Sequence, residues 1–161
     1  MIKQTLIFTI SGISILFTTL VWSYDTKLAE SYAELFSEVK GKNSGKAMHF
    51  VIPHNFIKDI KAGKEIVVID VRTPSETELF SMTSEKNLKI PANEIFKPEN
   101  LARIPTDKQV MVICKSGARA TAIGTALRHI GFDNVHILKG GFQDLSSYYG
   151  ARQANQKPKQ W

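Results

Sequence analysis

The sequence predicts an α/β domain with a mostly parallel central sheet and helices on both faces. Two apolar runs, residues 66–71 and 110–113, are nearly continuous, as is typical of parallel strands that are covered on both faces. Segments with apolar residues at helical spacing alternate with these strands, at residues 54–62 and 118–130. With 161 residues, the chain is long enough for one small domain of this class and extensions at its ends.

The first 22 residues are the most apolar stretch of the chain. Lys3 is the only charged residue there, and a run rich in Ile, Leu and Phe continues to Trp22. This order is typical of a signal peptide, and the run is also just long enough to span a membrane. We therefore expect residues 1–23 to be a cleaved signal peptide, or an anchor formed by residues 5–22. Because the flanking cation stays in the cytoplasm, both alternatives predict a periplasmic or extracytoplasmic domain.

Residues 24–46 are predicted to form an amphipathic helix followed by a linker. Apolar side chains recur at helical spacing between Asp25 and Lys40, so we expect the helix to begin at Asp25 and to end at Gly41. This helix is expected to pack on the domain or to form a stalk, and a partner-binding helix is the alternative. The polar residues 41–46 are interpreted as a flexible linker that marks the domain boundary.

The domain itself is expected to cover residues 47–150. Residues 73–105 are polar and interrupted by prolines. The polar residues 151–161 are predicted to form a disordered tail. The other expected elements are a strand at 48–52, a helix at 54–62, a strand at 66–71, a strand, loop and helix at 110–130, a strand at 135–138, a turn at Gly140-Gly141 and a helix at 142–149.

Reactive chemistry is expected where the strand 110–113 ends in Cys114, the only cysteine of the chain. Free backbone N–H groups in the following turn and the dipole of the next helix favour a negative charge on the sulfur. The thiolate is the reactive form of cysteine. An inert core cysteine is the alternative, but Lys115, Gly117 and Arg119 in the loop favour the reactive interpretation.

The loop Cys114-Lys115-Ser116-Gly117-Ala118-Arg119-Ala120 resembles the active-site loop of single-domain rhodaneses, sulfurtransferases that carry sulfur as a cysteine persulfide. Three further segments resemble the family in the same order: Asp70-Val71-Arg72 after a strand, residues 131–135, and the diglycine turn within residues 138–142. The resemblance implies a rhodanese-like fold over residues 47–150. It also implies an enzyme that moves a sulfane sulfur from an anionic donor such as thiosulfate to a thiol or cyanide, without a cofactor.

Within this resemblance, Cys114 is the predicted nucleophile. The backbone amides after it are expected to hold the thiolate and then the persulfide. The cations Lys115 and Arg119 are expected to attract the donor, and Ser116 is a candidate cap for the helix. Asp70 and Arg72 are expected to hold the loop. The alternative is a surface ion pair that contributes little to stability. The predicted donor-binding residues are Lys115, Ser116, Gly117, Ala118, Arg119 and Ala120.

The sequence departs from the family at one place. Single-domain rhodaneses usually carry a Gly-His-Ile-Pro-Gly-Ala segment before the next short strand, whereas alignment on Ile90-Pro91 puts residues 82–87 there. The rim of the pocket is therefore expected to differ.

Two other functions use related loops. A non-catalytic persulfide carrier or binding module needs the same loop, and cysteine phosphatases or arsenate reductases place five residues before the arginine, whereas four separate Cys114 from Arg119.

Composition restricts the partners. The net charge of +6 favours binding of small anionic ligands or of a partner with an acidic surface. The sequence has no basic patch with interleaved aromatic residues, so nucleic acid binding is not expected. A single cysteine excludes an internal disulfide and any CxxC site. The histidines lack the spacing of metal ligands, so no metal is expected. The expected partners are the sulfur donor, its acceptor, which could be a protein, and a membrane only through an uncleaved N-terminal segment.

Overall fold

The computed structural model describes residues 9–10, 13–14, 23–83 and 86–154. The chain divides into two compact units, residues 1–34 and 35–161. In the first unit, strands β1 (Thr9–Ile10) and β2 (Ile13–Ser14) pair antiparallel. Most of the predicted signal peptide or anchor lies outside the described residues, so it stays a prediction. Among the residues that are described, no helix combines the length and apolar character needed to cross a membrane.

The predicted amphipathic helix is α1 (Thr26–Leu35). Its start is as predicted, because the Asp25 side chain accepts a hydrogen bond from the Leu28 amide at 2.9 Å. The predicted end at Gly41 is wrong: residues 36–38 form a turn, and the Val39 amide bonds to the Phe36 carbonyl three residues back, which closes the helix earlier. None of the α1 residues is buried.

The segment expected to be a flexible linker is instead helical. It forms a 3₁₀ turn, η1 (Gly41–Asn43), and one turn of helix, α2 (Ser44–Ala47). Gly41 adopts a left-handed φ of +58°, which a glycine tolerates at no steric cost. The Ser44 hydroxyl donates to the Gly41 carbonyl at 2.7 Å and closes the turn. Local hydrogen bonds therefore order a segment whose polar composition predicted flexibility.

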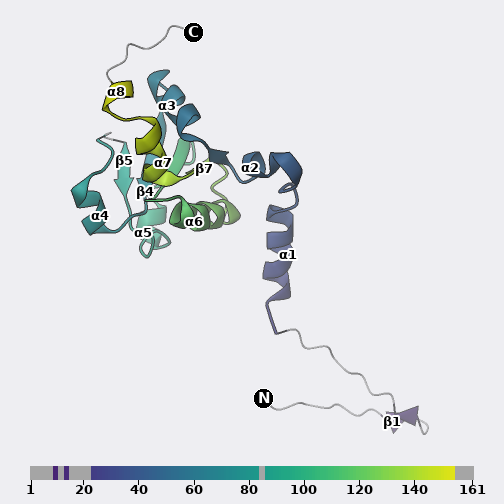
Figure 1. Cartoon of the computed structure of the whole chain (residues 1–161). Helices are drawn as coiled ribbons and strands as arrows, with labels where there is room; N and C mark the ends of the chain where they lie inside the picture. The colour runs from purple at the N-terminus through teal and green to yellow at the C-terminus, as the bar shows by residue number, and fades with distance from the viewer. Residues whose placement is uncertain (1–8, 11–12, 15–22, 84–85, 155–161) are drawn as a thin grey trace. The chain divides into compact units, whose positions relative to one another are not determined.

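The second unit contains a five-stranded parallel sheet, which confirms the predicted fold class (Figure 1). Its strand order is β3-β7-β6-β4-β5. In the register of the central pair, Asp70 of β4 lies opposite Ile113 of β6. The residues that follow these two strands therefore emerge side by side at the carboxyl edge of the sheet, where α/β folds place their ligands. The strands are β3 (Phe50–Val51), β4 (Ile66–Asp70), β5 (Asn87–Lys89), β6 (Gln109–Ile113) and β7 (Val135–Leu138).

Helices cover both faces of this sheet, as predicted (Figure 1). One apolar cluster joins Val110 and Val112 of β6 to Leu127 of α6. The other joins Met111 of β6 to Phe56 of α3, and it includes α7. Successive β6 residues thus point to opposite faces. The helices of this unit after β3 are α3 (Pro53–Lys61), α4 (Pro74–Leu79), α5 (Pro98–Leu101), α6 (Ala118–His129), α7 (Gly141–Tyr148) and α8 (Ala151–Ala154).

Several boundaries differ from the sequence prediction. The strand expected at residues 48–52 is reduced to β3, and Ile130, which was expected on the apolar stripe of α6, is half exposed. Ile130 lies just after the last turn of α6, beyond the stripe that faces the sheet. The predicted disordered tail begins with the helix α8, and residues 155–161 lie outside the described residues. Strand β7 has the predicted bounds.

Candidate active site

Cys114 lies directly after β6 and is almost completely buried, with 1% of its surface exposed. Two backbone amides donate to its sulfur: that of Gly117 at 3.2 Å and that of Ala120 at 3.4 Å. Both belong to the start of α6, whose first N–H groups have no partner within the helix. The sulfur is therefore held where hydrogen bonds and the helix dipole favour a negative charge.

The loop after Cys114 is tight because its glycine has a left-handed backbone. Gly117 is the N-cap of α6, with a φ of +91° and no side-chain cap. Ser116 precedes the N-cap and makes no capping hydrogen bond, so the prediction that it caps the helix is wrong. Lys115, Ser116 and Ala118 are exposed, whereas Gly117 is buried. The exposed side chains are the ones that can meet a ligand.

The backbone after the diglycine turn binds the backbone of this loop, a role that the sequence did not indicate. The amide of Phe142 donates to the Cys114 carbonyl and that of Gln143 to the Lys115 carbonyl, each at 2.9 Å. A Cβ atom on Gly141 would lie 2.2 Å from the Cys114 carbonyl oxygen. Only a glycine lets the two backbones approach so closely, so the start of α7 clamps the cysteine loop.

Asp70 and Arg72 form a buried ion pair, and the alternative of a surface pair is wrong. Their side chains are 0% and 2% exposed, and Arg72 Nη2 lies 2.7 Å from Asp70 Oδ2. Arg72 Nη2 also donates to the carbonyl of Phe80 at 2.7 Å. The guanidinium carbon lies 4.6 Å from the centre of the Phe80 ring and 4.0 Å from that of Phe142. Because the Phe142 amide binds the Cys114 carbonyl, the pair supports the start of α7 and through it the loop.

Glu76 is a residue of this site that our sequence analysis missed. Its carboxylate receives two hydrogen bonds from Arg119, from Nη1 to Oε2 and from Nη2 to Oε1, both at 2.7 Å. It also forms a capping box with Thr73, the N-cap of α4. The Arg119 hydrogen bonds, followed by the bond from the Thr73 amide, lower the pKa of Glu76 to about 2. A Thr-x-x-Glu pattern after a strand was the signal that could have revealed the cap.

Arg119 is bound by the Glu76 carboxylate. Its hydrogen bonds with Glu76 are the main cause that raises its pKa above the ordinary value, and its interaction with Cys114 adds to the same effect. The side chain of Arg119 is 36% exposed and that of Glu76 is 29% exposed, so a ligand from solvent can reach the pair.

Two exposed apolar side chains come just before the segment where the sequence departs from the family pattern. Leu79 is 82% exposed and Phe80 is 56% exposed. Farther along, Met82 packs on the apolar cluster of α3 and α7, and its carbonyl accepts from the Asn87 side chain at 2.9 Å. Ser84 and Glu85 lie outside the described residues. Phe80, which precedes this segment, covers Arg72 with its ring and accepts a hydrogen bond from it.

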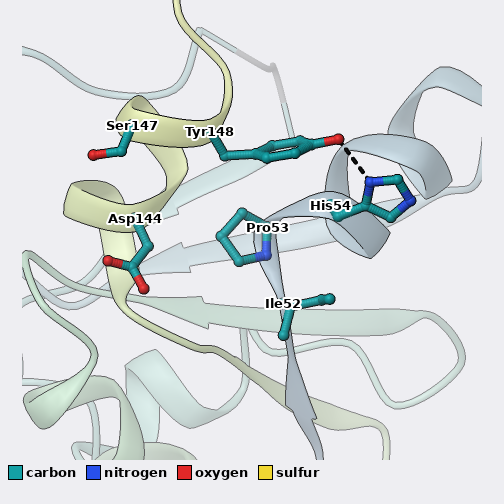
Figure 2. Close-up of a pocket in the computed structure, with 6 residues that line it drawn as sticks. All are labelled: Ile52, Pro53, His54, Asp144, Ser147 and Tyr148. Atoms are coloured by element: carbon teal, nitrogen blue, oxygen red, sulfur yellow. Dashed lines mark hydrogen bonds between the residues drawn. The ribbon is translucent and has the colours of Figure 1, made fainter.

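A separate shallow cleft lies between α3 and α7 and contains none of the predicted site residues. Its volume is about 420 Å³, and Figure 2 shows the hydrogen bond of 2.7 Å between His54 and Tyr148 in its wall. Among the described residues, no three His, Cys, Asp or Glu side chains are grouped as metal ligands would be.

Comparisons with known proteins agree with this geometry. The family model of the rhodanese-like domain matches residues 53–148. A protein of Allochromatium vinosum named sulfurtransferase is 31% identical over 78 residues, which cover 48% of this chain and 69% of that protein. The mitochondrial thiosulfate sulfurtransferase RDL2 of Saccharomyces cerevisiae is 27% identical over 94 residues, covering 53% of this chain and 63% of that protein.

Other relatives are larger proteins. The probable adenylyltransferase/sulfurtransferase MoeZ of Mycobacterium tuberculosis is 29% identical over 91 residues, which are 56% of this chain but only 23% of MoeZ.

Among solved structures, a rhodanese-related protein of Thermoplasma volcanium is 27% identical, with a TM-score of 0.52 over 62% of this chain and 92% of that one. With a matching family model over more than half of its length, the chain belongs to the rhodanese-like domain family.

Proposed function

We propose that this protein is a sulfurtransferase that moves a sulfane sulfur from an anionic donor such as thiosulfate to a thiophilic acceptor. The observation that carries the proposal is the Cys114 sulfur, which accepts hydrogen bonds from the Gly117 and Ala120 amides at the start of α6. These donors stabilise a thiolate, which is the nucleophile that sulfur transfer requires. The sulfurtransferase names of relatives support the same reaction class.

The reaction has two steps, each a displacement at sulfur. The Cys114 thiolate attacks the outer sulfur of thiosulfate, and the sulfur–sulfur bond of the donor breaks with its electron pair leaving on sulfite. The resulting persulfide carries one negative charge on its outer sulfur. An acceptor such as cyanide or a thiolate then attacks that outer sulfur, and the electron pair returns to Cys114. No general base is needed if the thiol is already ionised.

The outer sulfur of the persulfide must pass to an acceptor outside the chain. Cys114 is the only cysteine, so no second thiol can resolve the persulfide to an internal disulfide. A persulfide carrier would share this property, and turnover separates the two functions. An enzyme releases many equivalents of thiocyanate from thiosulfate and cyanide, whereas a carrier loads once.

The test is mass spectrometry of the purified full chain after incubation with thiosulfate. We expect a product heavier by one sulfur atom, which cyanide removes. Cys114→Ser should abolish the added mass and turnover, with an almost unchanged melting temperature, because the serine hydroxyl can still accept hydrogen bonds from the Gly117 and Ala120 amides. A wild-type protein that never gains sulfur, or a serine variant that still transfers it, would refute the proposal.

A further inference from the structure

We propose that Glu76 is a specificity-determining residue that weakens the binding of donors with an oxyanion end and so favours donors without one. The inference rests on the sulfurtransferase function proposed above. It concerns which sulfane sulfur donors the site accepts. The preferred class is a small organic persulfide, whose outer sulfur is bonded to another thiol sulfur, over thiosulfate, whose outer sulfur is bonded to a sulfonate-like group.

The geometry of the pair with Arg119 is the first argument. Both terminal nitrogens of Arg119 bind both oxygens of the Glu76 carboxylate at 2.7 Å. This two-pronged arrangement is the one in which a guanidinium binds an oxyanion of a ligand. The carboxylate therefore occupies the edge of Arg119 formed by its two terminal nitrogens, where an oxyanion of thiosulfate could otherwise bind. Such a donor must displace Glu76 or bind without these two nitrogens.

The second argument is that Glu76 is held in place independently of Arg119. Thr73 donates to Glu76 Oε2 from its amide at 2.9 Å and from its hydroxyl at 3.0 Å. The amide of Glu76 in turn donates to the Thr73 hydroxyl at 3.3 Å. With its pKa lowered to about 2, the carboxylate is ionised at every pH at which a thiolate reacts. It is therefore a permanent competitor for the guanidinium.

The third argument concerns the positive charge of the loop that is still available to attract a donor. Glu76 neutralises Arg119, whereas Lys115 is exposed and has no carboxylate partner in the part of the chain that the structure describes. One unpaired cation in the loop attracts a dianion less strongly than two would. A persulfide presents no oxyanion next to its transferable sulfur. The Cys114 thiolate attacks that outer sulfur, the sulfur–sulfur bond of the donor breaks, and its electron pair leaves on the donor's thiolate.

Glu76→Gln is the decisive variant, because glutamine keeps the length of the side chain and an oxygen that can accept from Thr73. Thiosulfate binding is measured by calorimetry in full-length protein that also carries Cys114→Ser, so no reaction consumes the ligand. We expect Glu76→Gln to tighten the dissociation constant about three- to tenfold, as for freed charge-assisted hydrogen bonds. Glu76→Asp should tighten it less, because a shorter carboxylate keeps its charge but cannot reach both nitrogens.

Glu65→Gln is the matched control. Glu65 also forms ion pairs, with Lys86 and Lys108, but it lies just before β4, at the other end of that strand from the cysteine loop. Its substitution removes the same charge and should leave thiosulfate binding unchanged. Equal tightening in both glutamine variants would show an effect of net charge alone and would overturn the inference. Unchanged binding in Glu76→Gln and Glu76→Asp would overturn it as well.

Kinetics of proteins with Cys114 intact complete the test. The KM for thiosulfate should fall in Glu76→Gln, and the KM for glutathione persulfide should stay the same. A common fall for both donors would contradict a role in donor choice. If the wild type turned over neither donor, the proposed function would fail, while the binding experiment would still decide whether Glu76 competes with an oxyanion.

Discussion

Gly141→Ala should separate the cysteine loop from the helix that supports it. The added Cβ would lie 2.2 Å from the Cys114 carbonyl oxygen and 2.8 Å from both the Gly117 nitrogen and the Lys115 carbonyl oxygen. All three neighbours are backbone atoms, which cannot rotate away as the end of a flexible side chain can. Either α7 or the loop must therefore shift by close to an ångström.

The expected cost has two components. An alanine at the left-handed φ of +59° is strained by about 1–2 kcal/mol. The shift also weakens the hydrogen bonds from Phe142 and Gln143 to the loop carbonyls, each worth about 0.5–1.5 kcal/mol. We therefore expect a loss of about 2–5 kcal/mol in the free energy of unfolding. A displacement of this size at Cys114, the proposed nucleophile, should also lower kcat/KM for thiosulfate about 100-fold.

Gly63→Ala provides the matched control for this variant. Gly63 has a comparable φ of +76°, but a Cβ there would have no atom within 4 Å. It should therefore suffer the strain of about 1–2 kcal/mol and leave sulfur transfer unchanged. Urea unfolding and initial-rate kinetics of both variants measure the difference. If Gly141→Ala lost no more stability or activity than Gly63→Ala, the clamp between α7 and the loop would not exist.

Four further predictions follow from the ion pairs and from the N-terminal sequence. Asp70→Ala leaves the buried Arg72 unpaired and should cost about 3–5 kcal/mol in urea unfolding; a loss below 1 kcal/mol would contradict this. Arg119→Ala removes a cation and leaves the Glu76 carboxylate unneutralised beside the cysteine loop, so it should weaken transition-state binding of thiosulfate, measured by kcat/KM, by about 1–3 kcal/mol; unchanged kinetics would refute its role. The ionised Glu76 should stabilise the fold above its unfolded pKa of 4.5, and the advantage of the wild type over Glu76→Gln should disappear as pH falls to about 2; an advantage that persists at pH 2 would refute the assignment. Residues 1–23 should direct export, so cell fractionation should find the domain outside the cytoplasm, and soluble full-length protein in the cytosol would disprove it.

The sequence alone determined the parts of this protein that depend on one element at a time. The continuous apolar run of β6 identified a strand buried on both faces, and the helical pattern after Cys114 identified α6. The bounds of β7 were predicted to the residue. These signals are local, because the burial of each element on the core leaves a periodic pattern in its own residues. The position of Cys114 at a strand end follows from them.

Only the tertiary structure decided what surrounds Cys114. Glu76 is 43 residues from Arg119 in the chain, and no local pattern states that they meet. They meet because β4 pairs with β6, so the segment after β4 lies beside the loop after β6. The contact between Gly141 and the Cys114 carbonyl likewise requires β7 to pair with β6. Strand order joins segments that are distant in the chain, and the periodicity of a single strand contains no record of its neighbours.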